Sequence, residues 1–218
     1  MLPVYDLEPA VGHCWIAPNA TVVGEVSVGD FCSIWHNVVI RGDINAVIIL
    51  NYTSIGDRTV IHTANSLPTG FPAAIHIGTH VQIGPGCSIY SSIIEDDVFV
   101  GANSVIMEGV RIEKGAIILP NSVVPPGRLI PACQVWGGNP VQYVRDALES
   151  EIFANYAYTF QIYNLSQVYL AQFTPWAYNY LQKEATQEDV DLKPSDLVSV
   201  YRKLPPTKTK WYYDYGLC

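Results

Sequence analysis

The sequence predicts an all-β core, a parallel β-helix of hexapeptide repeats, followed by a C-terminal helical segment and an extended tail. Three observations predict this fold. Isoleucine or valine recurs at every sixth position, small residues recur four positions later, and glycine and aspartate fill the places between. Composition divides the chain into residues 1–140 for the β-helix, 141–202 for the helical segment and 203–218 for the tail.

The six-residue ladder is clearest from Ile77 to Ile130, where a single step of five separates Ile89 from Ile94. Helices repeat their apolar face every three or four residues and strands every two, so a period of six indicates a repeat architecture. The ladder residues are Ile16, Val22, Val28, Ile34, Ile40, Ile49, Ile55, Ile61, Ile77, Ile83, Ile89, Ile94, Val100, Ile106, Ile112, Ile118, Val124 and Ile130.

The period has a physical cause, because three short strands joined by tight turns close one triangular coil, and each ladder residue points into it. Small residues such as Cys32, Thr53 and Cys87 occupy the crowded corners. Glycines such as Gly84 and Gly101 are expected to supply turns, because glycine tolerates positive φ. Buried aliphatic side chains contribute roughly 1.5–3 kcal/mol each, so a stacked ladder can offset the ordering of many turns.

The ladder is interrupted twice, at residues 41–48 and 63–76, and loops that leave a rigid scaffold commonly carry function. In the first interruption Arg41 and Asp43 lie two residues apart. On a strand, that spacing puts both side chains on one side. Two interpretations remain open: ion pairing across to a neighbouring copy of the prism, or a solvated turn with two unrelated charges.

Three histidines flank the second interruption: His62 precedes it, and His76 and His80 lie at its far end. Catalytic zinc usually takes three protein ligands of this kind and keeps one position open. The alternative is that these are surface or corner histidines that hydrogen-bond backbone carbonyls. The spacing alone leaves both interpretations open.

The charge balance excludes several classes of partner. The net charge is -8 and the sequence pI is about 4.9, which argues against nucleic acid and anionic membrane surfaces. Residues 1–15 are neither Arg- and Ser-rich, as a mitochondrial transit peptide would be, nor a secretory signal. We therefore expect a cytosolic chain, or one whose targeting signal has been removed or lies elsewhere.

The helical segment has an unusual composition, because residues 152–182 carry no charge and are rich in tyrosine and phenylalanine. Asn155, Gln161 and Pro175 make this stretch too polar and too broken for a transmembrane span. The simple expectation is a helix that begins near Val141 and packs back on the prism. Because aromatic residues dominate buried protein contacts, we also expect part of it to dock against a sister chain or a membrane subunit.

Together these motifs make the chain from about Tyr5 to Arg145 resemble the gamma-class carbonic anhydrases. The resemblance rests on the Arg41–Asp43 turn, the histidine that ends a later rung, the proline-containing loop, the five-residue step and the closing stretch Trp136–Pro140. It implies a left-handed β-helix that assembles as a trimer. In that family three histidines bind zinc at each subunit interface, two from one chain and one from its neighbour.

The resemblance also implies which ligand positions this chain has kept. His62 falls on the first ligand position, Pro85 on the second and Tyr90 on the third. Proline has no side-chain donor atom for a metal, and tyrosine is an unusual zinc ligand. A glutamine that orients the reacting water in the family falls on Gly56. We therefore expect no cofactor, no bound metal and no catalytic residue.

Degraded ligands on an intact ladder resemble the carbonic anhydrase-like subunits of mitochondrial respiratory complex I. This resemblance implies a non-catalytic structural subunit, with two other gamma carbonic anhydrase-type chains and membrane-arm subunits as partners. It also implies a peripheral place on the matrix side of the inner membrane, with Arg41 and Asp43 at subunit interfaces. One alternative is an active zinc carbonic anhydrase with a site rebuilt from Tyr90, His76 or His80. The other is a hexapeptide acyltransferase with His62 as general base.

Overall fold

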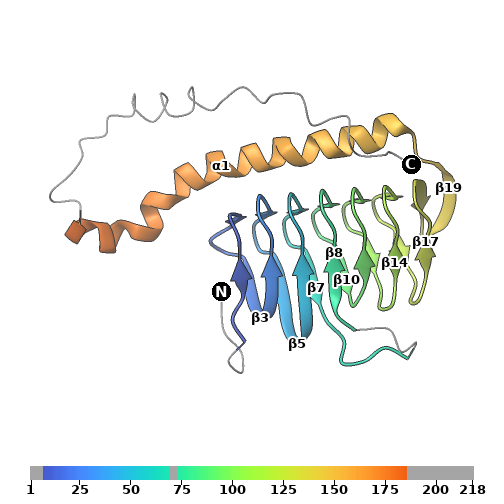
Figure 1. The fold of residues 1–218 in the computed structure, drawn as a ribbon, viewed down its shortest axis with the longest axis horizontal. Coiled ribbons are helices and arrows are strands. Elements are labelled where there is room, and N and C mark those ends of the chain that lie inside the picture. The colour runs from blue at the N-terminus through green and yellow to red at the C-terminus, as the bar shows by residue number, and fades with distance from the viewer. Residues whose placement is uncertain (1–6, 69–72, 186–218) are drawn as a thin grey trace. The chain divides into compact units, whose positions relative to one another are not determined.

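A computed structural model describes residues 7–68 and 73–185 of the chain (Figure 1). The chain divides into two units, the first ending at Val168 and the second beginning at Tyr169. The first unit contains a parallel β-solenoid of about seven turns. The predicted β-helix of hexapeptide repeats with a helix after it is therefore confirmed.

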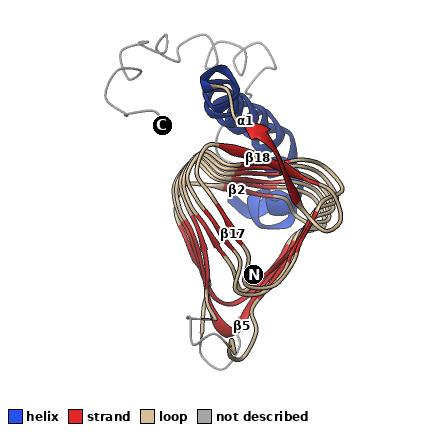
Figure 2. Cartoon of the chain, turned by 90° about the vertical axis from the view of Figure 1, so that its right-hand side faces the viewer, coloured by secondary structure: helices blue, strands red, loops and turns tan. Residues whose placement is uncertain are grey.

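The solenoid is a prism with three walls, seen end-on in Figure 2. One eight-stranded sheet forms the first wall, and one eleven-stranded sheet bends round a corner to form the other two. The strands of the first wall are β2 (Trp15–Ile16), β4 (Ser33–Ile34), β6 (Ser54–Ile55), β9 (Gln82–Ile83), β12 (Phe99–Val100), β15 (Ile117–Ile118), β18 (Gln134–Gly137) and β19 (Gln142–Asp146).

The eleven-stranded sheet supplies the remaining strands. All of its pairs are parallel, and within the first wall only β18 and β19 pair antiparallel. Its strands are β1 (Ala10–Val11), β3 (Thr21–Val28), β5 (Val39–Ile49), β7 (Val60–His62), β8 (Ile75–Ile77), β10 (Ser88–Tyr90), β11 (Ile93–Ile94), β13 (Val105–Ile106), β14 (Arg111–Ile112), β16 (Val123–Val124) and β17 (Leu129–Ile130).

The core consists of the ladder residues in register. Ile61, for example, lies opposite Ile40 on one side and Ile89 on the other. Every ladder residue except the partly exposed Ile16 is buried. The corner residues Thr53 and Thr59 are buried as well, and their hydroxyls donate to backbone carbonyls of the next coil, at 2.8 and 3.0 Å. The period therefore predicted both the fold and its core.

The first interruption of the ladder differs from the prediction, because residues 41–48 do not leave the solenoid as a loop. They belong to β5, which runs from Val39 round a corner to Ile49. The neighbouring strand β3 pairs with both ends of β5, and its register shifts between Gly24 and Val26. The extra residues of β5 are accommodated there as an irregularity in the pairing.

The role predicted for the turn glycines is also corrected. Gly84 and Gly101 do not have positive φ. They are required because coils approach closely: a Cβ at Gly84 would lie 2.6 Å from the Ala102 nitrogen. Positive φ is instead found at Gly86, Gly109 and several non-glycine residues that fill the corners.

The helix predicted from Val141 begins later. Residues 142–146 form β19, which pairs with β18, and helix α1 runs from Glu149 to Ala185. Glu151 accepts hydrogen bonds from Arg145, at 2.7 and 2.6 Å, and from the backbone nitrogen of Leu148, at 3.0 Å. These bonds fix the helix start and lower the pKa of Glu151 to about 2.

The segment boundaries 140/141 and 202/203 stay predictions, and the tail at 203–218 lies outside the described residues. No helix among the residues that the structure describes is long and apolar enough to span a membrane.

Candidate functional site

The candidate site lies on one wall of the prism, where Arg41, His62 and Tyr90 occupy aligned positions on adjacent strands. Arg41 lies opposite His62 between β5 and β7, and His62 lies opposite Tyr90 between β7 and β10. The rings of His62 and Tyr90 are 6.2 Å apart between centroids and inclined by 64°. The structure therefore brings the first and third predicted ligand positions side by side.

Pro85, at the second predicted position, lies away from this pair. It is exposed in the turn that follows β9, before β10 begins, whereas Tyr90 ends β10. The backbone of Gly56, on the adjacent coil, approaches it so closely that a Cβ there would lie 2.6 Å from the Pro85 nitrogen. Position 85 could therefore contribute a metal ligand only through a side chain that points away from the prism. Proline has no side-chain donor atom for this role.

The other two histidines do not join His62. His76 is exposed on β8, on the far side of the corner that β5 turns, and His80 lies in a turn that α1 covers. Within residues 7–68 and 73–185 no three His, Cys, Asp or Glu side chains are gathered to hold a metal ion. The donor set at the family's ligand positions, one imidazole and one exposed phenol, does not fit zinc.

Arg41 and Asp43 pair with each other within this chain, through Nη2 and Oδ2. The hydrogen bond from Arg41 lowers the pKa of the Asp43 carboxyl. The other oxygen, Oδ1, is covered and has no hydrogen-bond partner among the described residues. The role of Asp43 at a subunit interface stays a prediction.

Ser91, which the sequence analysis missed, holds both ends of the loop between β7 and β8. Its hydroxyl accepts a hydrogen bond from the Ala64 nitrogen and donates one to the Ala73 oxygen, both at 2.6 Å. The residue is buried and has a positive φ of 22°. The five-residue step between Ile89 and Ile94 could have pointed to Ser91, because it marks a corner that is one residue shorter than in a regular repeat.

Replacing Ser91 by Ala is expected to lower the free energy of unfolding by about 2 kcal/mol, because both hydrogen bonds to the loop ends are lost in a buried place. Chemical denaturation measures the change. Ser92→Ala is the matched control, since the buried Ser92 hydroxyl has no hydrogen-bond partner in the described chain and its loss should cost little. Equal losses in the two variants would contradict a clamping role for Ser91.

The half-buried Cys14 and the buried Cys32 and Cys87 offer no nucleophile to replace zinc chemistry. Burial raises the pKa of Cys14 to about 11 and that of Cys32 to about 12, and it also raises the pKa of Cys87. Thiols with such pKa values carry almost no thiolate at neutral pH. These three residues therefore act as small packing groups.

Comparison with known proteins agrees with the fold and the ladder. Residues 91–126 match the family model described as bacterial transferase hexapeptide (six repeats). A crystal structure of a hexapeptide transferase family protein from Anaplasma phagocytophilum is 29% identical, with a TM-score of 0.72 over 78% of this chain and 97% of that one.

Two curated relatives from Arabidopsis thaliana are more specific. Gamma carbonic anhydrase 2, mitochondrial, is 31% identical over 212 residues, which cover 94% of this chain and 76% of the relative. Gamma carbonic anhydrase-like 1, mitochondrial, is 35% identical over 193 residues, 88% of this chain and 77% of the relative. By sequence, length and fold, this chain belongs to the gamma carbonic anhydrase family.

Proposed function

We propose that the chain is a non-catalytic structural subunit of mitochondrial NADH:ubiquinone oxidoreductase, complex I. It would form a heterotrimer with two other gamma carbonic anhydrase-type chains, peripherally attached on the matrix side of the membrane arm. The observation that carries this proposal is the register that sets Tyr90, rather than a third histidine, opposite His62. The mitochondrial names of the relatives support the compartment.

The loss of zinc follows from how the family builds its sites. Each interfacial site needs two histidines from one chain and one from its neighbour. This chain offers His62 alone to one interface, and Pro85 offers nothing to the other. A heterotrimer that contains it keeps at most one complete site, between its two sister chains. The prism itself remains intact, so a structural role survives.

Exposed apolar side chains support the proposed partners. On the wall that carries the candidate site, Val60 and Tyr90 are 36% and 39% exposed. On the first part of α1, Tyr158 and Leu165 are 47% and 48% exposed. Aromatic and aliphatic side chains of this kind are enriched at the centres of protein interfaces. One face would meet a sister chain, and the other a membrane-arm subunit.

Purification of the native protein with its partners tests the proposal. We expect native mass spectrometry of the gently solubilised membrane fraction to find this chain with two different gamma carbonic anhydrase-type chains and with complex I subunits. Recovery as a soluble homotrimer without membrane partners would exclude complex I membership. If such a homotrimer contained stoichiometric zinc, the proposal that this chain has lost the zinc site would also be wrong.

Asp43→Ala is expected to weaken association with the sister chains at least about tenfold, because an interfacial donor loses its acceptor. Sedimentation of mixed chains measures the affinity. Glu108→Ala removes an exposed carboxylate from the same corner of the prism on a later coil and is the matched control. An unchanged affinity in Asp43→Ala would remove this residue from the interface.

A further inference from the structure

One corner of the prism carries a column of aromatic rings in an unfavourable backbone conformation. Phe31, Tyr52 and His80 occupy equivalent turns of successive coils, with φ values of 61°, 58° and 54°. The left-handed conformation is unfavourable for a bulky residue, so three in a row need compensation. The rings stack: Phe31 lies 4.8 Å from Tyr52, and Tyr52 lies 5.0 Å from His80 at an interplanar angle of 3°.

The first part of α1, residues 149–168, packs on this aromatic column. Tyr156 lies 4.3 Å from His80, Phe160 lies 4.9 Å from Tyr52, and Tyr163 lies 5.4 Å from Phe31. These three helix residues follow one another at spacings of four and three, so they share one face. At one end of the column, Asn155 donates a hydrogen bond of 3.2 Å to the backbone oxygen of Asp97. The column and the helix face therefore form one interface.

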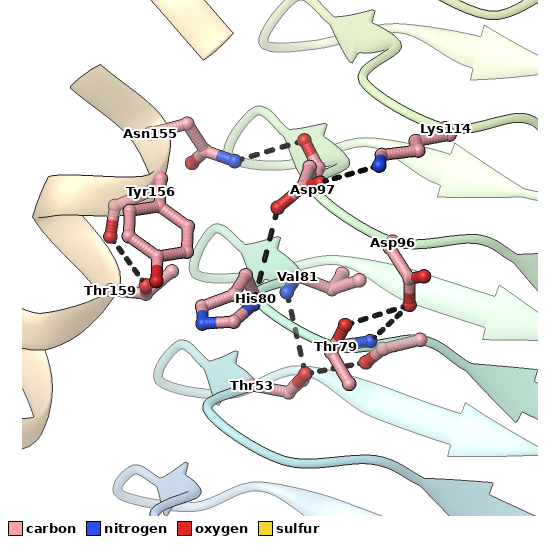
Figure 3. A network of polar contacts seen from close by, with 11 residues as sticks. Thr53, Thr79, His80, Val81, Asp96, Asp97, Lys114, Asn155, Tyr156 and Thr159 are labelled. Carbon is pink, nitrogen blue, oxygen red and sulfur yellow. Dashed lines mark hydrogen bonds and ion pairs between the residues drawn. The ribbon is translucent and has the colours of Figure 1, made fainter. Parts of the chain in front are cut away.

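His80 is the imidazole of this interface, and Figure 3 shows it between Tyr156 of α1 and Asp97. Its Nδ1 is 4.0 Å from Asp97 Oδ1, and the other oxygen of Asp97 is 3.7 Å from the Lys114 ammonium. Asp96 accepts two hydrogen bonds from Thr79. His80 Nε2 is buried and has no hydrogen-bond partner among the described residues. A second proton on the ring would thus reside on a nitrogen without an acceptor.

Burial, rather than the charge of the groups that face His80, favours its neutral form. The next two coils supply Asp96, Asp97 and Lys114, and the preceding coil and the helix supply the faces of Tyr52 and Tyr156. Burial lowers the pKa of His80 to about 4, although Asp96 opposes the shift. Burial also raises the pKa of Asp97, which weakens it as a counter-ion.

We propose that His80 is a pH-sensitive latch for the first part of α1: the neutral ring holds the helix against the prism, and protonation releases it. An undocked histidine titrates near 6.5. Docking is therefore complete above that pH and is lost progressively as the pH falls toward 4. The latch is independent of zinc and of the proposed partners, and it controls whether residues 149–168 stay in place.

Hydrogen exchange of the full-length protein, read by mass spectrometry and corrected for intrinsic rates, tests the latch. Between pH 7.5 and pH 5 the opening constant of residues 149–168 should rise about 25-fold, whereas the ladder strands stay protected. His80→Phe should keep the helix docked and remove most of this pH dependence. Phe31 shows that phenylalanine fits such a turn.

Two results would overturn the latch. One is helix protection that does not change with pH in the wild-type protein. The other is a His80→Phe variant as sensitive to pH as the wild type, which would assign the effect to Asp96 or Asp97. If His80→Phe fails to fold, NMR titration of the His80 ring in the wild-type protein decides: a pKa above 6 contradicts the latch, and a pKa below 5 supports it.

Discussion

Replacing Pro85 and Tyr90 together by histidine is expected to give a trimer that binds about one zinc ion per interface, whereas the wild-type chain binds almost none. The register already sets position 90 opposite His62 on the adjacent strand. Position 85 is exposed at the other end of β10, so it can reach only a neighbouring chain. Three imidazoles then complete the ligand set that zinc requires. Metal analysis of the purified trimer measures the gain.

The single variants separate this explanation from adventitious binding. Pro85→His alone supplies two histidines across an interface, and Tyr90→His alone supplies two within one chain, so each should bind zinc far more weakly. The triple variant His62→Ala, Pro85→His, Tyr90→His should lose the gain. Zinc content is the readout rather than carbon dioxide hydration, because Gly56 still lacks the amide that the family uses. A double variant that forms trimers without zinc would contradict the assigned ligand positions.

The sequence predicted the relative positions in the candidate site because the ladder residues fix the register between coils. Ile61 and Ile89 must stack in the core, so the residues that follow them, His62 and Tyr90, must end adjacent strands. A one-residue slip would turn the ladder outward, and burial forbids it. The fold and the relation between these two positions were therefore both accessible from a single periodicity.

The features that the sequence did not predict depend on contacts between residues far apart in the chain. The Ser91 hydroxyl binds two loop ends that are 18 and 27 residues away, and no local pattern records such a contact. The aromatic column was hidden for the same reason, because Tyr52 and His80 occupy equivalent corners only when the loop between β7 and β8 is left out of the count. Strand β19 was missed because its partner, β18, rather than its own sequence, determines its conformation.

Close approach between coils also explains why some positions require glycine, and substitution there is expected to destabilise the fold strongly. Gly101→Ala is expected to lower the free energy of unfolding by about 3 kcal/mol, because the added carbon has no room. That carbon would lie 2.4 Å from the Pro120 nitrogen and 2.7 Å from the Leu119 carbonyl carbon. Both are backbone atoms of the next coil, held by the ladder, so neither can move aside without separating the coils. Urea denaturation measures the loss.

Gly127→Ala is the matched control, because Gly127 has a φ of +65° but nothing within 4 Å of the added carbon. Only the cost of the left-handed conformation remains there, about 1 kcal/mol. If Gly127→Ala were the more damaging change, turn conformation rather than the approach of coils would explain the glycines of the ladder. A larger loss of stability in Gly101→Ala than in Gly127→Ala would show that the spacing between stacked coils, about 4.8 Å in a parallel sheet, requires glycine at position 101.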